Sequence, residues 1–192
     1  GNGALLHALG DTIQMGLGID RSPAMVKVAQ TRRGDEKIRF EAVSGPVIPL
    51  PDQSVDVVIS MLSFRYLDWD PIMNEIRRVL VPGGRILVID MVTVPLSLRV
   101  IPQFIRSMCM TLFQQWRYPH FKRALRRLIG DDGWQTMLKY NPIRAQHEFV
   151  WYLESRFPGR KVETLNVGRH ARVLAFDSGP LQPGSVAPQS YP

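Results

Sequence analysis

The chain has 192 residues, of which 45% are apolar and 21% charged, and its formal net charge is +7. This length and composition exclude a fibrous repeat and a wholly disordered chain, and they suit one domain with a single core. One cysteine, Cys109, excludes an intrachain disulfide framework and is typical of a reducing cytoplasm, where we expect the protein.

The charge is divided unevenly between the two halves. Residues 1–95 carry 10 Lys/Arg and 11 Asp/Glu, net −1, whereas residues 96–192 carry 14 and 6, net +8. Such an excess is typical of a surface for RNA or anionic lipid, of a site for an anionic substrate, or of a solvated basic face. A basic binding module therefore stays open as a non-enzymatic function.

The first 43 residues alternate between helix and strand. The glycine turn Gly1-Asn2-Gly3 leads into a helix, and a short buried strand ends at Asp20. Ser22-Pro23 starts a second helix, because serine caps a helix and proline suits its first turn. Residues 38–43 then form the next strand.

The same alternation continues to residue 90. The β-branched run at residues 55–60 predicts a buried parallel strand, and Asp70-Pro71 opens an amphipathic helix that Pro82-Gly83-Gly84 ends. Residues 85–90 form another buried strand. Strands and helices in this order predict a parallel α/β sheet with right-handed crossovers.

The second half has a different pattern. Residues 91–144 are helical in tendency and rich in aromatic and basic side chains, and a helix follows at residues 145–156. Residues 162–167 and 173–176 are close enough in sequence to form an antiparallel hairpin. Residues 178–192 are rich in Pro, Gly, Ser and Gln, which predicts a disordered tail.

The first half of the chain contains several short sequence motifs in a defined order. An acid, Asp20, ends a strand about 17 residues after a Gly-x-Gly turn, an arrangement that holds a ribose by its hydroxyls. The segments Pro51–Val58, Asp70-Pro71 and Arg77–Arg85 follow, the last containing Pro82-Gly83-Gly84. Over about residues 1–90 the series resembles the class I S-adenosylmethionine-dependent methyltransferases, in the branch of small-molecule, quinone- and sterol-type enzymes.

The resemblance implies a fold. We expect an α/β, Rossmann-like, doubly wound and mainly parallel sheet with an antiparallel C-terminal strand, in one methyltransferase domain at residues 1–177 with a helical lid insertion at residues 91–144. In the family a further strand precedes the glycine loop, between the strands that end here at Asp20 and Ser60. We therefore expect an N-terminally truncated chain whose first strand is missing, with a gap or an irregular pairing at that place.

The resemblance also implies S-adenosylmethionine as the cofactor. Asp20 would accept both ribose hydroxyls, and Ser44 stands where the family usually has an acid for the adenine amino group. The residues that the resemblance assigns to the cofactor are Gly1, Gly3, Ile19, Asp20, Arg21, Ser44, Gly45, Ser60, Met61 and Leu62.

The acceptor side is assigned to Phe64, Arg65 and Tyr66, and in the lid to Arg99 and Arg106. Many relatives have two histidines where Arg65-Tyr66 stands, so no histidine base is available there and no catalytic residue is named. Methyl transfer needs an aligned acceptor and the exclusion of water more than it needs a base. The apolar and basic lid suits a lipophilic acceptor with an anionic group, and contact of the lid with a membrane surface is a further expectation.

We therefore predict methyl transfer from S-adenosylmethionine to a small-molecule or lipid-like acceptor by in-line displacement. An NAD(P)-dependent oxidoreductase would also place an acid at Asp20 and stays an alternative, as does the basic RNA- or anionic-lipid-binding module. For the methyltransferase we expect no nucleic-acid partner and no metal, since Trp151 replaces the second histidine that a zinc helix beginning at His147 would need. The oligomeric state is left open.

Overall fold

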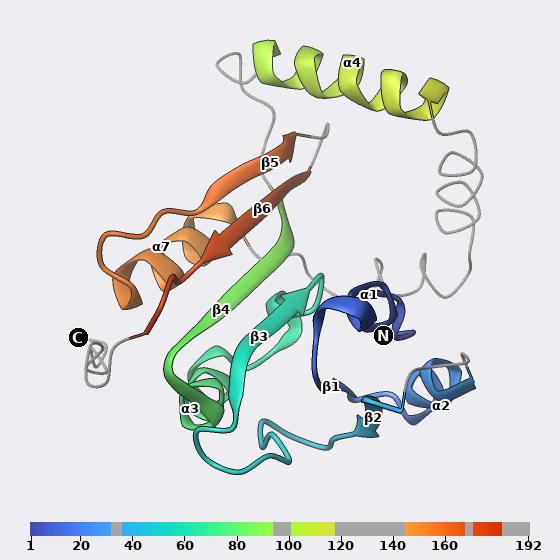
Figure 1. Ribbon diagram of the computed structural model, residues 1–192. Coiled ribbons are helices and arrows are strands. Elements are labelled where there is room, and N and C mark those ends of the chain that lie inside the picture. Colours follow the sequence, from blue (N-terminus) through green and yellow to red (C-terminus); the bar gives the residue numbers. More distant parts are fainter. Residues whose placement is uncertain (32–35, 94–100, 118–144, 168–170, 182–192) are drawn as a thin grey trace. The chain divides into compact units, whose positions relative to one another are not determined.

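The computed structural model describes residues 1–31, 36–93, 101–117, 145–167 and 171–181 (Figure 1). The chain divides into two compact units. The first comprises Gly1–Asp52 and Asp68–Val79, and the second comprises Gln53–Leu67 and Leu80–Pro192. The extent of a single methyltransferase domain over residues 1–177 stays a prediction.

The first unit is a small parallel α/β arrangement. Its strands β1 and β2 are parallel, with Gly16 opposite Ile38 and Asp20 opposite Ala42, as the alternation of the sequence predicts. Its elements are α1 (Ala4–Leu9), the 3-10 turn η1 (Gly10–Thr12), β1 (Gly16–Asp20), α2 (Pro23–Thr31), β2 (Ile38–Ala42) and α3 (Trp69–Val79).

Helix α3 has one apolar side and one charged side. The apolar residues that recur every three or four positions, Ile72, Met73, Ile76 and Val79, are all buried. On the charged side, the Arg78 guanidinium donates to the Glu75 carboxylate at 2.8 and 2.9 Å and to the carbonyl of Ile48 at 2.8 Å.

The same guanidinium also binds the loop that precedes β3. It donates to the carbonyl of Leu50 and to the carboxylate of Asp52, both at 2.8 Å. The backbone N–H of Ile48 donates to Glu75 at 3.0 Å. The hydrogen bonds of Arg78, followed by that of Ile48, lower the pKa of Glu75 from 4.5 to about 2.

The second unit contains a four-stranded sheet in the order β3-β4-β6-β5. Strand β4 is parallel to β3 and antiparallel to β6, and β5 and β6 form the predicted antiparallel hairpin, so the antiparallel C-terminal strand is confirmed (Figure 1). The elements are β3 (Val55–Met61), the 3-10 turn η2 (Phe64–Tyr66), β4 (Leu80–Thr93), α4 (Ile101–Arg117), α7 (Gln146–Arg156), β5 (Glu163–Val167) and β6 (Ala171–Asp177).

Strand β4 begins earlier than predicted, directly after α3 at Leu80, and it contains Pro82-Gly83-Gly84. Leu80 already lies opposite Val55, and the register shifts before Arg85 lies opposite Val57. The glycine backbone also has partners, because Gly83 N–H donates to the carbonyl of Leu181 at 2.8 Å and Leu181 N–H donates to that of Gly84 at 2.9 Å. Residues 178–181, which the sequence places in the tail, therefore differ from that prediction and pair with β4.

Helix α7 packs two of its aromatic residues, Phe149 and Tyr152, into the second unit. Phe64 of η2 meets Phe149 edge to face at 6.1 Å between ring centroids and lies 6.2 Å from the Tyr152 ring. Phe64, Phe149 and Leu153 of α7 are fully buried. Edge-to-face pairs of this kind are favoured by the ring quadrupole, so η2 is fixed against α7.

A buried ion pair joins η2 to the end of β4. Arg65 Nη1 lies 2.6 Å from Asp90 Oδ1, and both side chains are wholly inaccessible to solvent. The backbone N–H groups of Arg65 and Met91 also donate to the same carboxylate, each at 2.7 Å. A buried carboxylate is tolerated when it is paired and hydrogen-bonded in this way.

Strands β1 and β3 lie in separate sheets. Among the described residues β1 pairs only with β2, and β3 pairs only with β4. The gap or irregular pairing that we expect between the strands ending at Asp20 and Ser60 stays a prediction. In the part of the chain described, no helix is long and apolar enough to cross a membrane.

Glu75 should make stability depend on acidity. Because its folded pKa of about 2 lies below 4.5, its contribution is present above pH 4.5 and is lost as the pH falls toward 2. Urea unfolding at several pH values should show this loss for the parent chain and a flatter profile for Glu75→Gln. Identical profiles for the parent and Glu75→Gln would contradict the prediction.

Asp90→Asn should destabilise the second unit strongly. Removing one partner of a buried ion pair leaves the other charge uncompensated, at a cost of about 3–5 kcal/mol in unfolding free energy. The control is Asp177→Asn in the exposed pair with Arg85, at 3.3 Å, which should cost less than about 1 kcal/mol. Chemical denaturation measures both, and equal losses would show that the burial of Asp90 does not matter.

Candidate cofactor and acceptor site

The glycine turn before α1 has a backbone that only glycine suits. Gly3 has φ +76°, and a Cβ built on it would lie 2.6 Å from Cζ of Phe40. Asn2 Oδ1 accepts from the N–H of Ala4 at 3.2 Å, which closes the start of the helix. The turn thus packs closely onto the Phe40 ring of β2 and presents backbone without a side chain.

Asp20 lies beside this turn at the end of β1. Its Oδ1 accepts from the N–H of Ser22 at 2.8 Å, and its Oδ2 accepts from the amino group of Gly1. The carboxylate remains 28% exposed. The structure therefore brings two sequence-predicted cofactor residues, Gly1 and Asp20, into direct contact within the first unit.

The other predicted cofactor residues of this unit follow the two strand ends. Val43 N–H donates to the Asp20 carbonyl at 3.0 Å and so extends the pairing of β1 and β2. Ser44 and Gly45 come next, and parallel strands place their carboxyl ends at the same edge as Asp20 and Arg21. Ile19 is 37% exposed, and Gly45 has φ +130°.

In the second unit the end of β3 carries an unusual backbone. Leu62 has φ +55°, and its N–H donates to the carbonyl of Ile89 at 2.7 Å. The hydroxyls of Ser60 and Ser63 lie 3.0 Å apart, and Met61 is 44% exposed. A bulky residue at positive φ is strained and is typical of functional sites, so this turn fits the role predicted for residues 60–62.

The acceptor residues predicted in η2 differ in their surroundings. Phe64 packs in the core against α7 and exposes no surface. The Arg65 guanidinium is paired with Asp90, donates to the Tyr66 hydroxyl at 2.6 Å and lies 4.4 Å from the centre of the Tyr66 ring. Tyr66 is half-buried, so of these three its phenol is the group available to an acceptor.

Two lid residues, Arg99 and Arg106, were also predicted for the acceptor. Arg106 is exposed on α4, whereas Arg99 lies outside the described residues. Cys109 is an exposed free thiol, not the buried one that its apolar neighbours predict. The described residues contain no group of three or more His, Cys, Asp or Glu that could hold a metal ion.

Two residues that shape the site were not identified from the sequence. Phe40 supports the glycine turn, and Asp90 fixes Arg65. An acid at the end of an otherwise apolar strand, residues 85–90, was the available signal for Asp90. No feature of the sequence indicated the role of Phe40, because that role depends on the close approach of the glycine turn to its ring.

Comparison with known proteins agrees with this geometry. Residues 1–88 match the family model of a methyltransferase domain. A demethylmenaquinone methyltransferase of Thermus thermophilus is 35% identical over 78 residues, which cover 38% of this chain and 35% of the relative. An uncharacterised methyltransferase of Bacillus subtilis, YcgJ, is 30% identical over 94 residues, covering 47% and 37%. The chain thus matches about a third of the length of these curated relatives.

Solved structures share the fold. YcgJ of Bacillus subtilis gives a TM-score of 0.58 at 16% identity, over 96% of this chain and 89% of that one. The geranyl diphosphate C-methyltransferase of Streptomyces coelicolor gives 0.58 at 13% identity, over 94% and 69%. The predicted Rossmann-like α/β fold is confirmed by these similarities and by the parallel pairing of the strands. Over residues 1–88, a little less than half of its length, the chain is thus similar to a methyltransferase domain.

Proposed function

We propose that this chain transfers the methyl group of S-adenosylmethionine to a small, lipophilic acceptor of the quinone type. The observation that carries the proposal is the junction of the glycine turn with Asp20. A partly exposed carboxylate, oriented by the N–H of Ser22, lies there beside backbone that carries no Cβ.

This junction fits the nucleoside part of the cofactor. The Asp20 carboxylate only accepts hydrogen bonds at neutral pH, which suits the two hydroxyls of a ribose. Gly1 and Gly3 would leave room for the ribose and the methionine moiety. Ile19 offers apolar surface, Arg21 lies next to Asp20, and Ser44 and Gly45 would supply polar contacts for adenine.

For the second unit, the resemblance assigns Ser60, Met61 and Leu62 to the cofactor, and this assignment stays a prediction. When bound, the cofactor supplies a methyl group that is already activated by positive sulfur. The chain then has to hold the acceptor and keep water away from it. An exposed thioether and an isobutyl group at residues 61 and 62 suit that task, since neither offers a hydrogen bond to water.

Tyr66 is the proposed positioning group for the acceptor. Its hydroxyl accepts from Arg65 Nη2, so its own hydrogen remains available to donate. A quinone-type acceptor presents oxygen atoms that can accept such a bond. Tyr66 therefore would orient the acceptor without having to remove a proton from it.

The relatives support the acceptor class. The Thermus relative is named as acting on demethylmenaquinone, and the Streptomyces enzyme was solved with geranyl diphosphate and S-adenosylhomocysteine. Both acceptors carry isoprenoid chains or units. An NAD(P)-dependent oxidoreductase is less well supported, because β6 enters the sheet antiparallel to β4, as in the methyltransferases.

Asp20→Asn should weaken cofactor binding. Loss of the charge from a hydrogen-bonding partner should cost about 1.5–3 kcal/mol, which is roughly 10- to 100-fold in Kd. Calorimetric titration with S-adenosylhomocysteine measures it, and Asp11→Asn in the neighbouring η1 is the control that should leave Kd unchanged. An unchanged Kd for Asp20→Asn would remove Asp20 from the site. Binding of NAD(H) without S-adenosylhomocysteine would overturn the proposed function itself.

Tyr66→Phe should impair use of the acceptor and spare the cofactor. Transfer of a labelled methyl group to demethylmenaquinone should show a KM for the acceptor raised about fivefold, the loss of one neutral hydrogen bond. The Kd for S-adenosylhomocysteine should stay within twofold, about the scatter expected of a distant change. Tyr152→Phe, in the aromatic core of the same unit, is the control. Equal losses in acceptor and cofactor binding would show that Tyr66 only supports the fold.

A further inference from the structure

Helix α4 exposes its apolar side. Ile101, Ile105, Met108, Leu112 and Trp116 recur every three or four residues and so form one stripe along the helix. Each of them is exposed, from 37% at Ile101 to 78% at Trp116. We call these five residues the apolar stripe.

The side chains that the protein partly covers lie on another side of α4. Phe104, Ser107 and Thr111 are half-buried, and Thr111 Oγ1 donates to the carbonyl of Ser107 at 2.8 Å. Two of these three are polar. A helix that packs only within its own chain buries its apolar stripe, whereas α4 leaves its stripe exposed beside the side that is partly covered.

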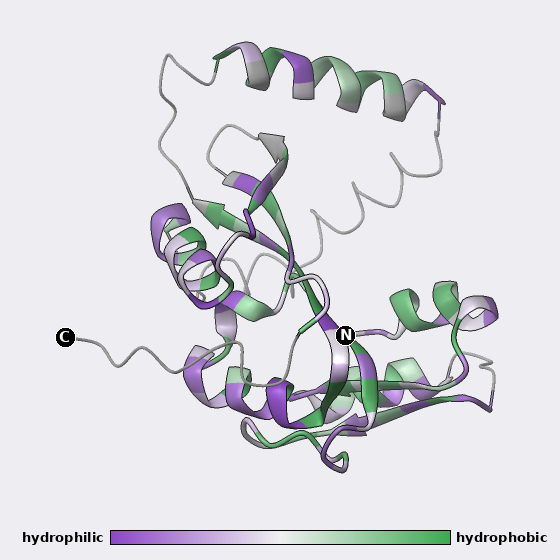
Figure 2. Cartoon of the chain, turned by 60° about the vertical axis from the view of Figure 1, so that its left-hand side comes forward, coloured by the Kyte–Doolittle hydropathy of each residue, from purple (hydrophilic) through white to green (hydrophobic). Residues whose placement is uncertain are grey.

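The charges around the stripe have one sign. On the helical wheel, Cys109 and then Phe113 follow the stripe on one side, and Arg106 and Arg117 lie beyond Phe113. The rings of Phe113 and Trp116 pack against each other with centroids 6.2 Å apart. In the sequence, residues 91–130 contain seven Lys/Arg and no Asp/Glu. Green apolar and purple polar bands alternate along α4 in Figure 2.

We propose that α4 is an interfacial helix that docks its apolar stripe on an anionic lipid surface. The helix is 17 residues, or about 26 Å, long, and its exposed side runs from the apolar stripe through Phe113 to two arginines. This composition suits the boundary between headgroups and acyl chains, where the arginines reach the phosphates. The proposal does not rest on the proposed methyl transfer.

Charge favours an anionic lipid surface over a second copy of the chain as the partner of the apolar stripe. A second copy of the chain would bring two helices of the same positive sign together, which like-charge repulsion disfavours. An anionic bilayer instead complements both the apolar stripe and the basic charge. Because α4 is not long and apolar enough to span a membrane, it would lie on the surface.

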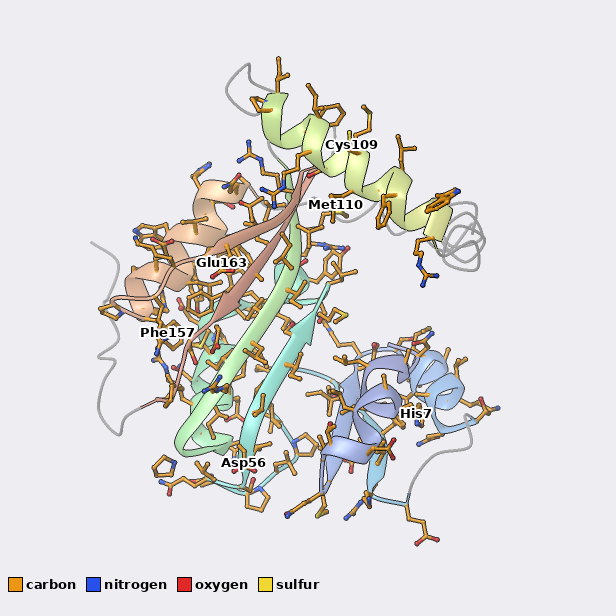
Figure 3. The ribbon with its side chains drawn as sticks, turned by 45° about the horizontal axis from the view of Figure 1, so that its top comes forward. His7, Asp56, Cys109, Met110, Phe157 and Glu163 are labelled. Atoms are coloured by element: carbon orange, nitrogen blue, oxygen red, sulfur yellow. The ribbon has the colours of Figure 1, made fainter. Side chains whose placement is uncertain are left out.

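The chain carries its own probe for this contact. Cys109 is the only cysteine, it is exposed, and on the helical wheel it lies beside the apolar stripe (Figure 3). An environment-sensitive maleimide fluorophore on Cys109 of the full chain should shift to shorter wavelength with phosphatidylglycerol-containing vesicles. It should not respond to vesicles of phosphatidylcholine alone. An unchanged emission while the protein sediments with anionic vesicles would overturn the docking of α4, since the basic charge alone would then hold the protein.

A matched pair of methionines tests the orientation of the helix. Met108 lies in the apolar stripe and is 47% exposed, whereas Met110 lies on a different side of the same helix and is 52% exposed (Figure 3 labels Met110). Glutamine is similar in size and in helix propensity, and leaves the charge unchanged. The double variant Met108→Gln/Leu112→Gln should lower partitioning onto anionic vesicles at least about tenfold, and Met108→Gln alone about threefold. Met110→Gln should stay within about twofold, the scatter of a neutral surface change.

Other outcomes would overturn the proposal or assign the apolar stripe to another partner. Equal effects of Met108→Gln and Met110→Gln would overturn the proposal, as would equal binding to neutral and anionic vesicles. Light scattering that shows a dimer of the parent chain but a monomer of Met108→Gln, without vesicle binding, would assign the stripe to a second copy instead. Circular dichroism of each variant checks that its helix content is retained.

Discussion

The buried carboxylate of Asp90 is the constraint on which the second unit depends. A charge without solvent access is costly unless its partners surround it, and the carboxylate at the end of β4 receives one guanidinium nitrogen and two backbone N–H groups. Satisfying it fixes the backbone of η2 as well as the Arg65 side chain. Residue 64 is then held against α7, and the Tyr66 phenol is held by the guanidinium.

The turn at Leu62 follows from the same connection. The chain must leave β3 at Met61 and reach η2, whose Arg65 N–H points to Asp90, within three residues. The N–H of Leu62 bonds to Ile89, the residue before Asp90, and the chain adopts a positive φ there. The ion pair offsets the strain of that turn, since it is one of several contacts that leave η2 a single arrangement.

Local patterns predicted the elements well and the long-range contacts poorly. The helix α3 and the strand β3 were predictable because periodicity and β-branching are properties of neighbouring residues. The same holds for the hairpin of β5 and β6 and, at the site, for the glycine turn and Asp20. The burial of Phe64 and the pairing of Leu181 with Gly83 join residues 85 or more positions apart, for which one sequence gives no periodic signal.

The apolar stripe of α4 is a second case in which the sequence predicts a local feature but not its contacts. Spacing alone predicts that residues 101, 105, 108, 112 and 116 share one face. It favours burial of that face in the protein, because most amphipathic helices pack on a core. Only the exposure of each residue shows that the stripe faces outward.

Neutralisation of Arg65 also changes what the acceptor residues can recognise. The resemblance assigns Arg65 to the acceptor side, yet this guanidinium is wholly buried and its charge is balanced by Asp90. An acceptor near η2 would therefore meet an uncharged phenol, which costs less to desolvate than a cation and suits a neutral, lipophilic molecule. If the acceptor carries an anionic group, that group has to be recognised by a cation other than Arg65. On the proposed function, Arg65 thus positions the Tyr66 phenol and does not bind the acceptor through its charge.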